Sequence, residues 1–359
     1  MKSGATIKFL FFILALCLIS CKTVNEMAIE IQEPAPITLP ISVQNIIVLN
    51  NTIVQPIDHG IERTYDEKEV AKDTYPLSLD SAVWATIGTF SNILEKSDFF
   101  NVVSYYKEAI RDDDEWLSIS MLSKQTQDDF YDLGNCDAII SIDRLLFKVN
   151  EKVKKNMGSY SINDNVFIDA KVEAVVTASV YIQGKDKPIT TFSAVDSLIF
   201  KSTFQADPAL VLKEIPEFMI QNLALDFGEL LAYKFIPDWK VVKRFMYTGY
   251  DSRMKEAYSY AKSQRWSEAE QLWSIELEKK DKPVDKARIA SNIALAKEMQ
   301  DNLEEAHKWA TRSKEYFTQA GIQDQDIQML RITEYITSLE DRMVKNHLLD
   351  IQWGTADEF

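Results

Sequence analysis

The sequence predicts an α/β or α+β domain with a mixed sheet, followed by an all-α domain of repeated helix pairs. Apolar runs alternate with helical patterns in the first part of the chain, which is typical of a parallel α/β layer. Stretches in which every second residue is apolar come next, and beyond residue 250 only the three-to-four-residue spacing of helices remains. We therefore expect an α/β domain over 42–236, a junction over 237–249, a helical domain over 250–347 and a tail over 348–359.

The first 20 residues have the features of a bacterial lipoprotein signal peptide. Two lysines precede the uncharged run Phe9–Ile19, which is too short to span a bilayer as a helix. The run leads to Ser20-Cys21, which resembles the lipobox whose cysteine is acylated. We expect Cys21 to carry fatty acyl chains such as palmitate and to anchor the protein, the alternative being an ordinary secretory signal.

Residues 21–41 contain Pro34, Pro36 and Pro40 among polar residues, which predicts a tether. Lys22 follows the predicted acylated cysteine, where many bacteria use Asp to retain lipoproteins in the inner membrane. Outer-membrane delivery is therefore expected. Few acidic residues follow Cys21, so we expect the protein to face the periplasm rather than the cell surface.

The predicted α/β domain begins with three strands separated by two helices. The strands are expected over 46–49, 99–103 and 138–142, and the helices over 79–94 and up to residue 130. A polar, irregular excursion is expected over 51–76.

Long antiparallel strands should follow. Residues 145–153 and 166–181 alternate apolar and polar side chains, and 189–204 should return as another strand. A helix is expected from Pro208 to about Phe235.

This order of elements resembles the periplasmic α/β domain of the curli-secretion channel lipoprotein and of the lipoprotein activators of penicillin-binding proteins. In that resemblance Ile46–Leu49, Phe100–Val103 and Asp137–Ser141 are successive strands. The resemblance implies a fold but no activity.

Two segments near the C-terminus, Arg265–Ala269 and Asn302–Ala306, share the pattern polar–bulky–x–Glu–Ala. Ala306 follows Ala269 by 37 residues, one tetratricopeptide unit of about 34 residues plus a short insertion. The segments thus resemble tetratricopeptide repeats, although Arg253 and Glu276 depart from that pattern. The resemblance implies that these residues form the repeat core: Ala257, Trp266, Ala269, Trp273, Ala294, Leu303, Ala306 and Ala310.

In such repeats the first helix of each pair lines a groove. By this register the candidate partner-binding residues are Asp251, Met254, Tyr258, Lys262, Arg288, Ser291, Leu295, Glu298 and Met299. The mixed polar and apolar lining suits a peptide segment or a partner helix.

The whole arrangement resembles a family of uncharacterised Bacteroidetes lipoproteins. The shared features include a junction with Pro237, Trp239, Arg244 and Tyr247. That family is a domain of unknown function and supplies no activity.

No motif predicts catalysis, a cofactor or a metal. Phosphate-binding glycine loops and the GxSxG elbow are absent from the sequence, and His59, His307 and His347 lie far apart. Asp112–Glu115 lacks the alternating spacing of a calcium loop. Cys136 is interpreted as a small buried residue rather than a nucleophile.

The net charge of −15 argues against binding nucleic acid. The leading hypothesis is a non-catalytic, lipid-anchored envelope protein whose repeats bind a protein or peptide. A glycan- or nutrient-capture lipoprotein is the alternative, and an envelope hydrolase is the least favoured. The sequence leaves the oligomeric state open.

Overall fold

The structure is a computed structural model. It describes residues 24–56, 59, 61–65, 69–71, 79–156, 165–204, 208–249 and 251–355. The chain divides into two compact units. The α/β unit comprises Ala35–Asp238 with the residues from Ile351 on, and the repeat unit comprises Trp239–Asp350 with the residues up to Pro34.

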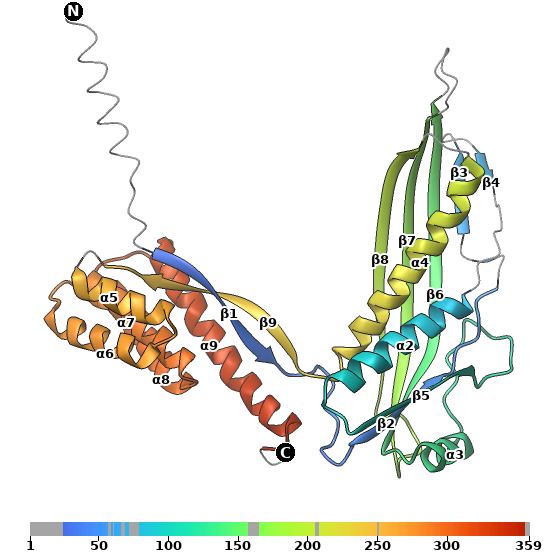
Figure 1. The fold of residues 1–359 in the computed structure, drawn as a ribbon, viewed down its shortest axis with the longest axis horizontal. Coiled ribbons are helices and arrows are strands. Elements are labelled where there is room, and N and C mark those ends of the chain that lie inside the picture. Colours follow the sequence, from blue (N-terminus) through green and yellow to red (C-terminus); the bar gives the residue numbers. More distant parts are fainter. Residues whose placement is uncertain are drawn as a thin grey trace, which may run out of the picture. The chain divides into compact units, whose positions relative to one another are not determined.

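The α/β unit is built on a mixed sheet (Figure 1). Its elements are β2 (Asn45–Asn50), β3 (Ile61–Tyr65), β4 (Glu69–Ala71), α2 (Asp80–Lys96), β5 (Val102–Ala109), α3 (Lys124–Gly134), β6 (Ala138–Asn156), β7 (Asn165–Ile182), β8 (Thr190–Phe204) and α4 (Pro208–Ala232). Strand β2 lies parallel between β5 and β6, and β3 runs parallel to the second half of β6. Strands β6, β7 and β8 pair antiparallel, as do β3 and β4. The predicted fold class is confirmed.

Strand β6 is one continuous strand where two were predicted, over 138–142 and 145–153. The pairing of β6 with β7 shifts register between Ile142 and Arg144, which places a β-bulge at Asp143. A bulge adds one residue and bends the strand without ending it. The carboxylate of Asp143 is buried there and accepts hydrogen bonds from Ser141 Oγ (2.6 Å), Ser179 Oγ (2.5 Å) and Asn51 Nδ2 (3.0 Å).

The expectation of an irregular excursion over 51–76 is wrong in part, because β3 and β4 form within it. Between β2 and β3, the side-chain amide of Gln55 forms with β6 the two backbone hydrogen bonds that a neighbouring strand would form. Its amide nitrogen donates to the carbonyl of Phe147 (3.0 Å), and its oxygen accepts from the Phe147 N–H (2.9 Å).

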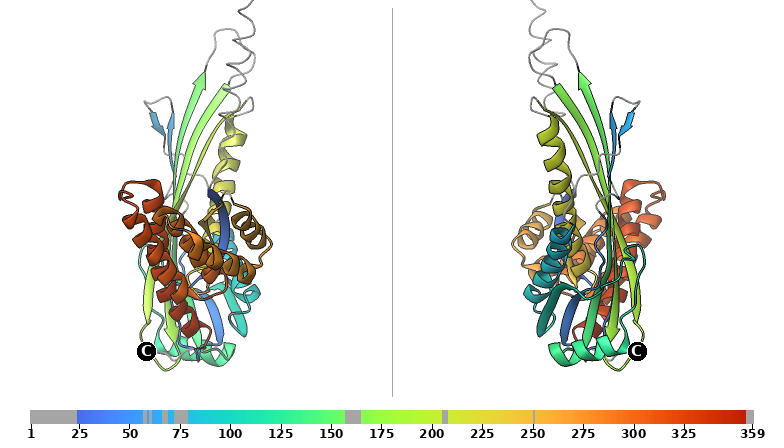
Figure 2. Two further views of the ribbon diagram at one scale, coloured as in Figure 1. Left: turned by 90° about the vertical axis from the view of Figure 1, so that its left-hand side faces the viewer. Right: turned by 90° about the vertical axis from the view of Figure 1, so that its right-hand side faces the viewer.

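Helices α2 and α4 cover one face of the sheet (Figure 2). They approach closely at Gly228, where an added Cβ would lie 2.5 Å from the Cβ of Thr89 and 2.8 Å from the carbonyl oxygen of Thr86. Thr86 Oγ1 donates to the Ala224 carbonyl across the same contact (3.0 Å). The opposite face is covered near Ile139 by α3, Ile110 and Leu122, and Cys136 is buried in the same cluster. Burial raises the pKa of the Cys136 thiol to about 11.

The repeat unit combines a two-stranded ribbon with five helices among the residues described. Its elements are β1 (Val24–Glu33), β9 (Asp238–Tyr247), α5 (Ser252–Lys262), α6 (Trp266–Lys279), α7 (Pro283–Met299), α8 (Leu303–Gln319) and α9 (Ile327–Gln352). Helices α5 and α6 pack as one pair and α7 and α8 as the next. All eight residues assigned to the repeat core are buried. Helix α9 runs to Gln352, so the tail expected from residue 348 begins later than predicted.

The tether predicted over 21–41 is wrong over residues 24–33, because Val24–Glu33 forms β1 and pairs with β9. Ile29 and Ile31 alternate with exposed or half-buried residues and are themselves buried. The prolines that favoured a tether follow the strand. Among the described residues, no helix is long and apolar enough to cross a membrane.

Candidate functional site

The groove predicted for a partner is occupied in part by the chain's own β1–β9 ribbon. Arg244 of β9 forms a two-point ion pair with Glu298 of α7, with Nε and Nη2 each 2.8 Å from a carboxylate oxygen. Glu298 also accepts from Tyr335 Oη (2.8 Å) and Arg342 Nη1 (3.0 Å) of α9. The Glu298 side chain is fully buried, so this carboxylate serves packing and is not open to a partner.

A second contact fixes the backbone of the ribbon. The side chain of Asn292 accepts from the Tyr247 N–H (2.8 Å) and donates to the Tyr247 carbonyl (2.7 Å). Asn292 thereby satisfies both backbone groups of a buried residue, which would otherwise be costly to bury. Leu295 and Met254, two more of the predicted groove residues, pack into a core with Met246 of β9.

The electrostatics of this contact follow from burial and pairing. Burial alone would lower the pKa of Arg244, but its hydrogen bond and ion pair with Glu298 outweigh that effect and raise the pKa. Tyr335 has its pKa raised well above the usual value, first by burial and then by the Glu298 carboxylate. At neutral pH the Tyr335 phenol is therefore neutral and donates its proton to the hydrogen bond with Glu298.

The two residues that depart from the repeat pattern interact with each other. Arg253 Nη1 lies 3.6 Å from Glu276 Oε2, and Lys280 Nζ lies 2.9 Å from Glu276 Oε1. Lys280 also reaches Asp251 (3.1 Å), whose carboxylate caps α5 by accepting from the Met254 N–H (2.8 Å). Asp251, a predicted partner-binding residue, is thus bound by the Lys280 ammonium and by the Met254 N–H.

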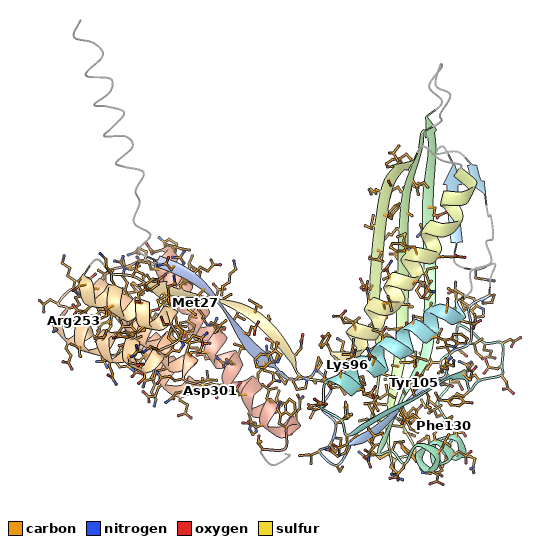
Figure 3. The ribbon with its side chains drawn as sticks, viewed as in Figure 1. Met27, Lys96, Tyr105, Phe130, Arg253 and Asp301 are labelled. Atoms are coloured by element: carbon orange, nitrogen blue, oxygen red, sulfur yellow. The ribbon has the colours of Figure 1, made fainter. Side chains whose placement is uncertain are left out.

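A hollow of about 510 Å³ remains open beside the ribbon, and we call it the β1 hollow. Its lining comprises residues 25–30 of β1, Val241 and Met246 of β9, and Tyr258, Ala261, Lys262, Gln264, Trp266 and Met299. Six consecutive residues of β1 line the hollow together with two residues of β9, so the hollow runs along β1. Met27, labelled in Figure 3, lies on this strand.

The β1 hollow brings together three of the nine predicted partner-binding residues, namely Tyr258, Lys262 and Met299. A separate hollow of about 320 Å³ is lined by Asp251, Met254 and Arg288. Of the remaining three, Ser291 borders a third hollow, whereas Leu295 and Glu298 are buried. The predicted residues therefore do not form one continuous open groove.

Sequence reasoning missed Asn292, Tyr335 and Arg342. Asn292 is a polar residue between apolar neighbours in the first helix of a repeat, and that placement was a usable signal. The roles of Tyr335 and Arg342 depend on the packing of α9, which no local pattern specifies.

The α/β unit contains weaker candidates. Arg111 closes the acidic loop by binding Asp113 with Nε (2.9 Å) and Nη2 (2.6 Å), and its side chain lowers the pKa of Asp113. The rings of His59 and Trp116 lie 5.2 Å apart beside a hollow of about 540 Å³. His307 Nε2 contacts Glu340 Oε1 at 3.1 Å. No group of three or more metal-ligating side chains occurs among the described residues, and Cys21 lies outside them.

Solved structures that resemble this chain do so only distantly. The solved structures that resemble the chain include a neuraminyllactose-binding hemagglutinin homolog from Helicobacter pylori, with 11% identity, a TM-score of 0.25, and coverage of 63% of this chain and 93% of that one. Another is a Xanthomonas campestris protein of family DUF330, with 12% identity, a TM-score of 0.24, and coverage of 56% and 90%. Likenesses at these TM-scores carry no weight for function. No curated protein sequence matches the chain.

Two family models match the chain in succession. The domain of unknown function DUF6340 matches residues 255–341, within the helices of the repeat unit. The domain of unknown function DUF8603 matches residues 43–247, from just before β2 to the end of β9. Because that match spans more than half of the sequence, the chain belongs to the DUF8603 family.

Proposed function

We propose that this protein is a non-catalytic, lipid-anchored interaction protein of the cell envelope that binds an extended segment of a partner protein along β1. The observation that carries the proposal is the β1 hollow, which combines a strand edge with Tyr258, Lys262 and Met299. Among the described strands β1 pairs only with β9, so its other edge has no strand neighbour. An extended peptide can add to such an edge through backbone hydrogen bonds.

The side chains around the edge suit a partner with alternating apolar residues. Met27, Met246 and Met299 contribute flexible thioether side chains that adapt to different apolar shapes. Lys262 is exposed and supplies the positive charge of the lining, whose two anions are Glu26, which Lys243 pairs at 2.8 Å, and Glu30. The hollow therefore favours an apolar segment with an acidic residue near Lys262.

The proposal also specifies how close the β1 hollow lies to the membrane and on which side of it. Only two residues separate Cys21 from Val24, the first residue of β1, and three chain steps span at most about 11 Å. If Cys21 is acylated, the β1 hollow is held close to the lipid surface rather than lifted away from it. Outer-membrane anchoring on the periplasmic side is the location we propose, and digestion by protease added to intact cells would contradict it.

Affinity purification of the anchored protein after crosslinking tests the binding site. The double variant Tyr258→Ala with Lys262→Glu should reduce recovery of the partner by about tenfold or more, since loss of central contacts commonly costs at least 1.4 kcal/mol. Lys308→Glu is the matched control, because Lys308 is exposed on α8 and outside the hollow. Equal recovery with both variants would contradict the proposal.

A further inference from the structure

We infer that the hollow between β9 and α9 binds a single carboxylate group carried on a short apolar body. This α9 hollow has a volume of about 340 Å³, within the range of small-ligand pockets. Residues 242–245 of β9 line one side, and Arg331, Tyr335 and Ser338, which lie on one face of α9, line the other. The α9 hollow and the β1 hollow share no lining residue, so the two sites are separate.

Arg331 is the cation that this site offers. Its guanidinium lies 4.3 Å from the centre of the Phe245 ring, and it forms no ion pair with any residue that the structure describes. The other two cations of the hollow are already paired, Arg244 with Glu298 and Lys243 with Glu26. In a chain with a net charge of −15, an arginine held by an aromatic ring and lacking a carboxylate partner indicates that the partner is external.

Two hydroxyl groups border the same space. Ser291 is 6% exposed, and its hydroxyl has no hydrogen-bond partner among the described residues. Ser338 Oγ accepts from Arg244 Nη2 at 3.0 Å, which leaves its own proton to be donated. A guanidinium fork with adjacent hydroxyl donors matches the two oxygens of a carboxylate.

The other lining residues limit the polarity, size and charge of the ligand. Val242, Phe245 and Ile332 are apolar, so the group next to the carboxylate should be apolar and short. Glu334 adds a negative charge to the lining, which offsets the charge of Arg331 and so favours a monoanion over a doubly charged phosphate. The carboxylate could belong to a free short-chain acid or to the C-terminal residue of a peptide.

Calorimetric titration of the full chain in detergent tests the site with three probes. These are 3-methylbutanoate, N-acetyl-alanyl-leucine with a free carboxyl group, and the amide of the same dipeptide. We expect saturable binding of at least one acid and binding of the amide at least about tenfold weaker. If 3-methylbutanoate binds as well as the dipeptide, the source is a free acid, whereas tighter dipeptide binding identifies a peptide C-terminus. Equal binding of acid and amide, or no saturable binding of either acid, would overturn the inference.

Variants separate the site from a general charge effect. Arg331→Gln should weaken acid binding at least about tenfold, and Glu334→Gln should strengthen it. Arg312→Gln is the control, because Arg312 also stacks on aromatic rings, those of Trp309 and Tyr316, but lies outside the hollow. Unchanged binding in Arg331→Gln, or an equal loss in Arg312→Gln, would overturn the inference. Circular dichroism melting of each variant separates lost binding from lost folding.

Discussion

The carboxylate of Glu298 connects three elements of the repeat unit through direct contacts. It receives the guanidinium of Arg244 from β9 and, from α9, the guanidinium of Arg342 and the phenol of Tyr335. Buried charges of this kind are costly unless they are paired and hydrogen-bonded, and here both conditions hold. The position of the ribbon against the helices therefore depends on one acidic residue.

Replacing Glu298 with glutamine should destabilise the repeat unit by about 3 to 5 kcal/mol, because Arg244 would remain buried without a counter-charge. Chemical denaturation monitored by circular dichroism measures the free energy of unfolding. Glu268→Gln is the control, since Glu268 pairs with Arg265 at the surface (2.7 Å) and should change stability far less. Similar effects of the two substitutions would show that the buried pair does not hold the ribbon.

The raised pKa of Asp143 predicts that the stability of the α/β unit depends on pH. Burial raises the pKa of Asp143 above its usual value, although Asn51, Ser141 and Ser179 donate to it. The folded state then holds this proton more tightly than the unfolded chain does. The Asp143 contribution to stability is therefore greatest below the unfolded pKa of about 3.9 and falls as the pH rises toward the raised pKa.

Asp143→Asn removes this titration, so its stability relative to the unsubstituted protein should improve as the pH rises through that window. Urea denaturation at a series of pH values measures the difference. Asp132→Asn, at an exposed position on α3, is the matched control. A stability difference for Asp143→Asn that stays constant with pH would contradict the prediction.

At the scale of the element, the sequence predicted what depends on local periodicity and missed what depends on distant pairing. The helix pairs of the repeats carry a strong periodic pattern and the parallel core strands carry continuous apolar runs, and both are present. Local patterns do not predict strand β1, because its partner β9 begins about 200 residues later and neither strand forms a sheet without the other. The helices that carry the predicted groove residues are present, but the ribbon that fills part of the groove could not be predicted from local patterns.

The contact between α2 and α4 gives a test at this scale. Gly228→Ala should destabilise the α/β unit by about 1 to 3 kcal/mol, because the new methyl group would meet Thr89 and the Thr86 backbone. This cost opposes the usual preference of helices for alanine. Gly88→Ala in α2 is the matched control, since its Cβ would meet nothing within 4 Å, and it should stabilise by about 0.5 to 1 kcal/mol. Thermal and urea denaturation distinguish the two outcomes, and a gain in stability at both positions would contradict the close approach.

At the scale of the whole molecule, each unit has its own buried core. The membrane anchor is the feature on which the proposed location depends. Cys21→Ala should release the protein from the membrane fraction or leave an uncleaved precursor, because the proposed anchor consists of the acyl chains on this residue. Cys136→Ala is the control, since Cys136 is buried in the α/β unit and should not affect anchoring. Fractionation followed by immunoblotting measures both, and a mature-sized Cys21→Ala protein that stays in the membranes would contradict the anchor.

The proposed function rests on capture of a partner segment along β1, and site-specific photo-crosslinking in cells tests it most directly. A photoreactive residue would replace Ala28 on β1, Tyr258 on α5 or, as a control, the exposed Lys308 on α8. The account predicts the same discrete crosslinked product at residues 28 and 258 and none at residue 308. No product at 28 and 258 in a normally anchored protein, or an equal product at 308, would contradict it.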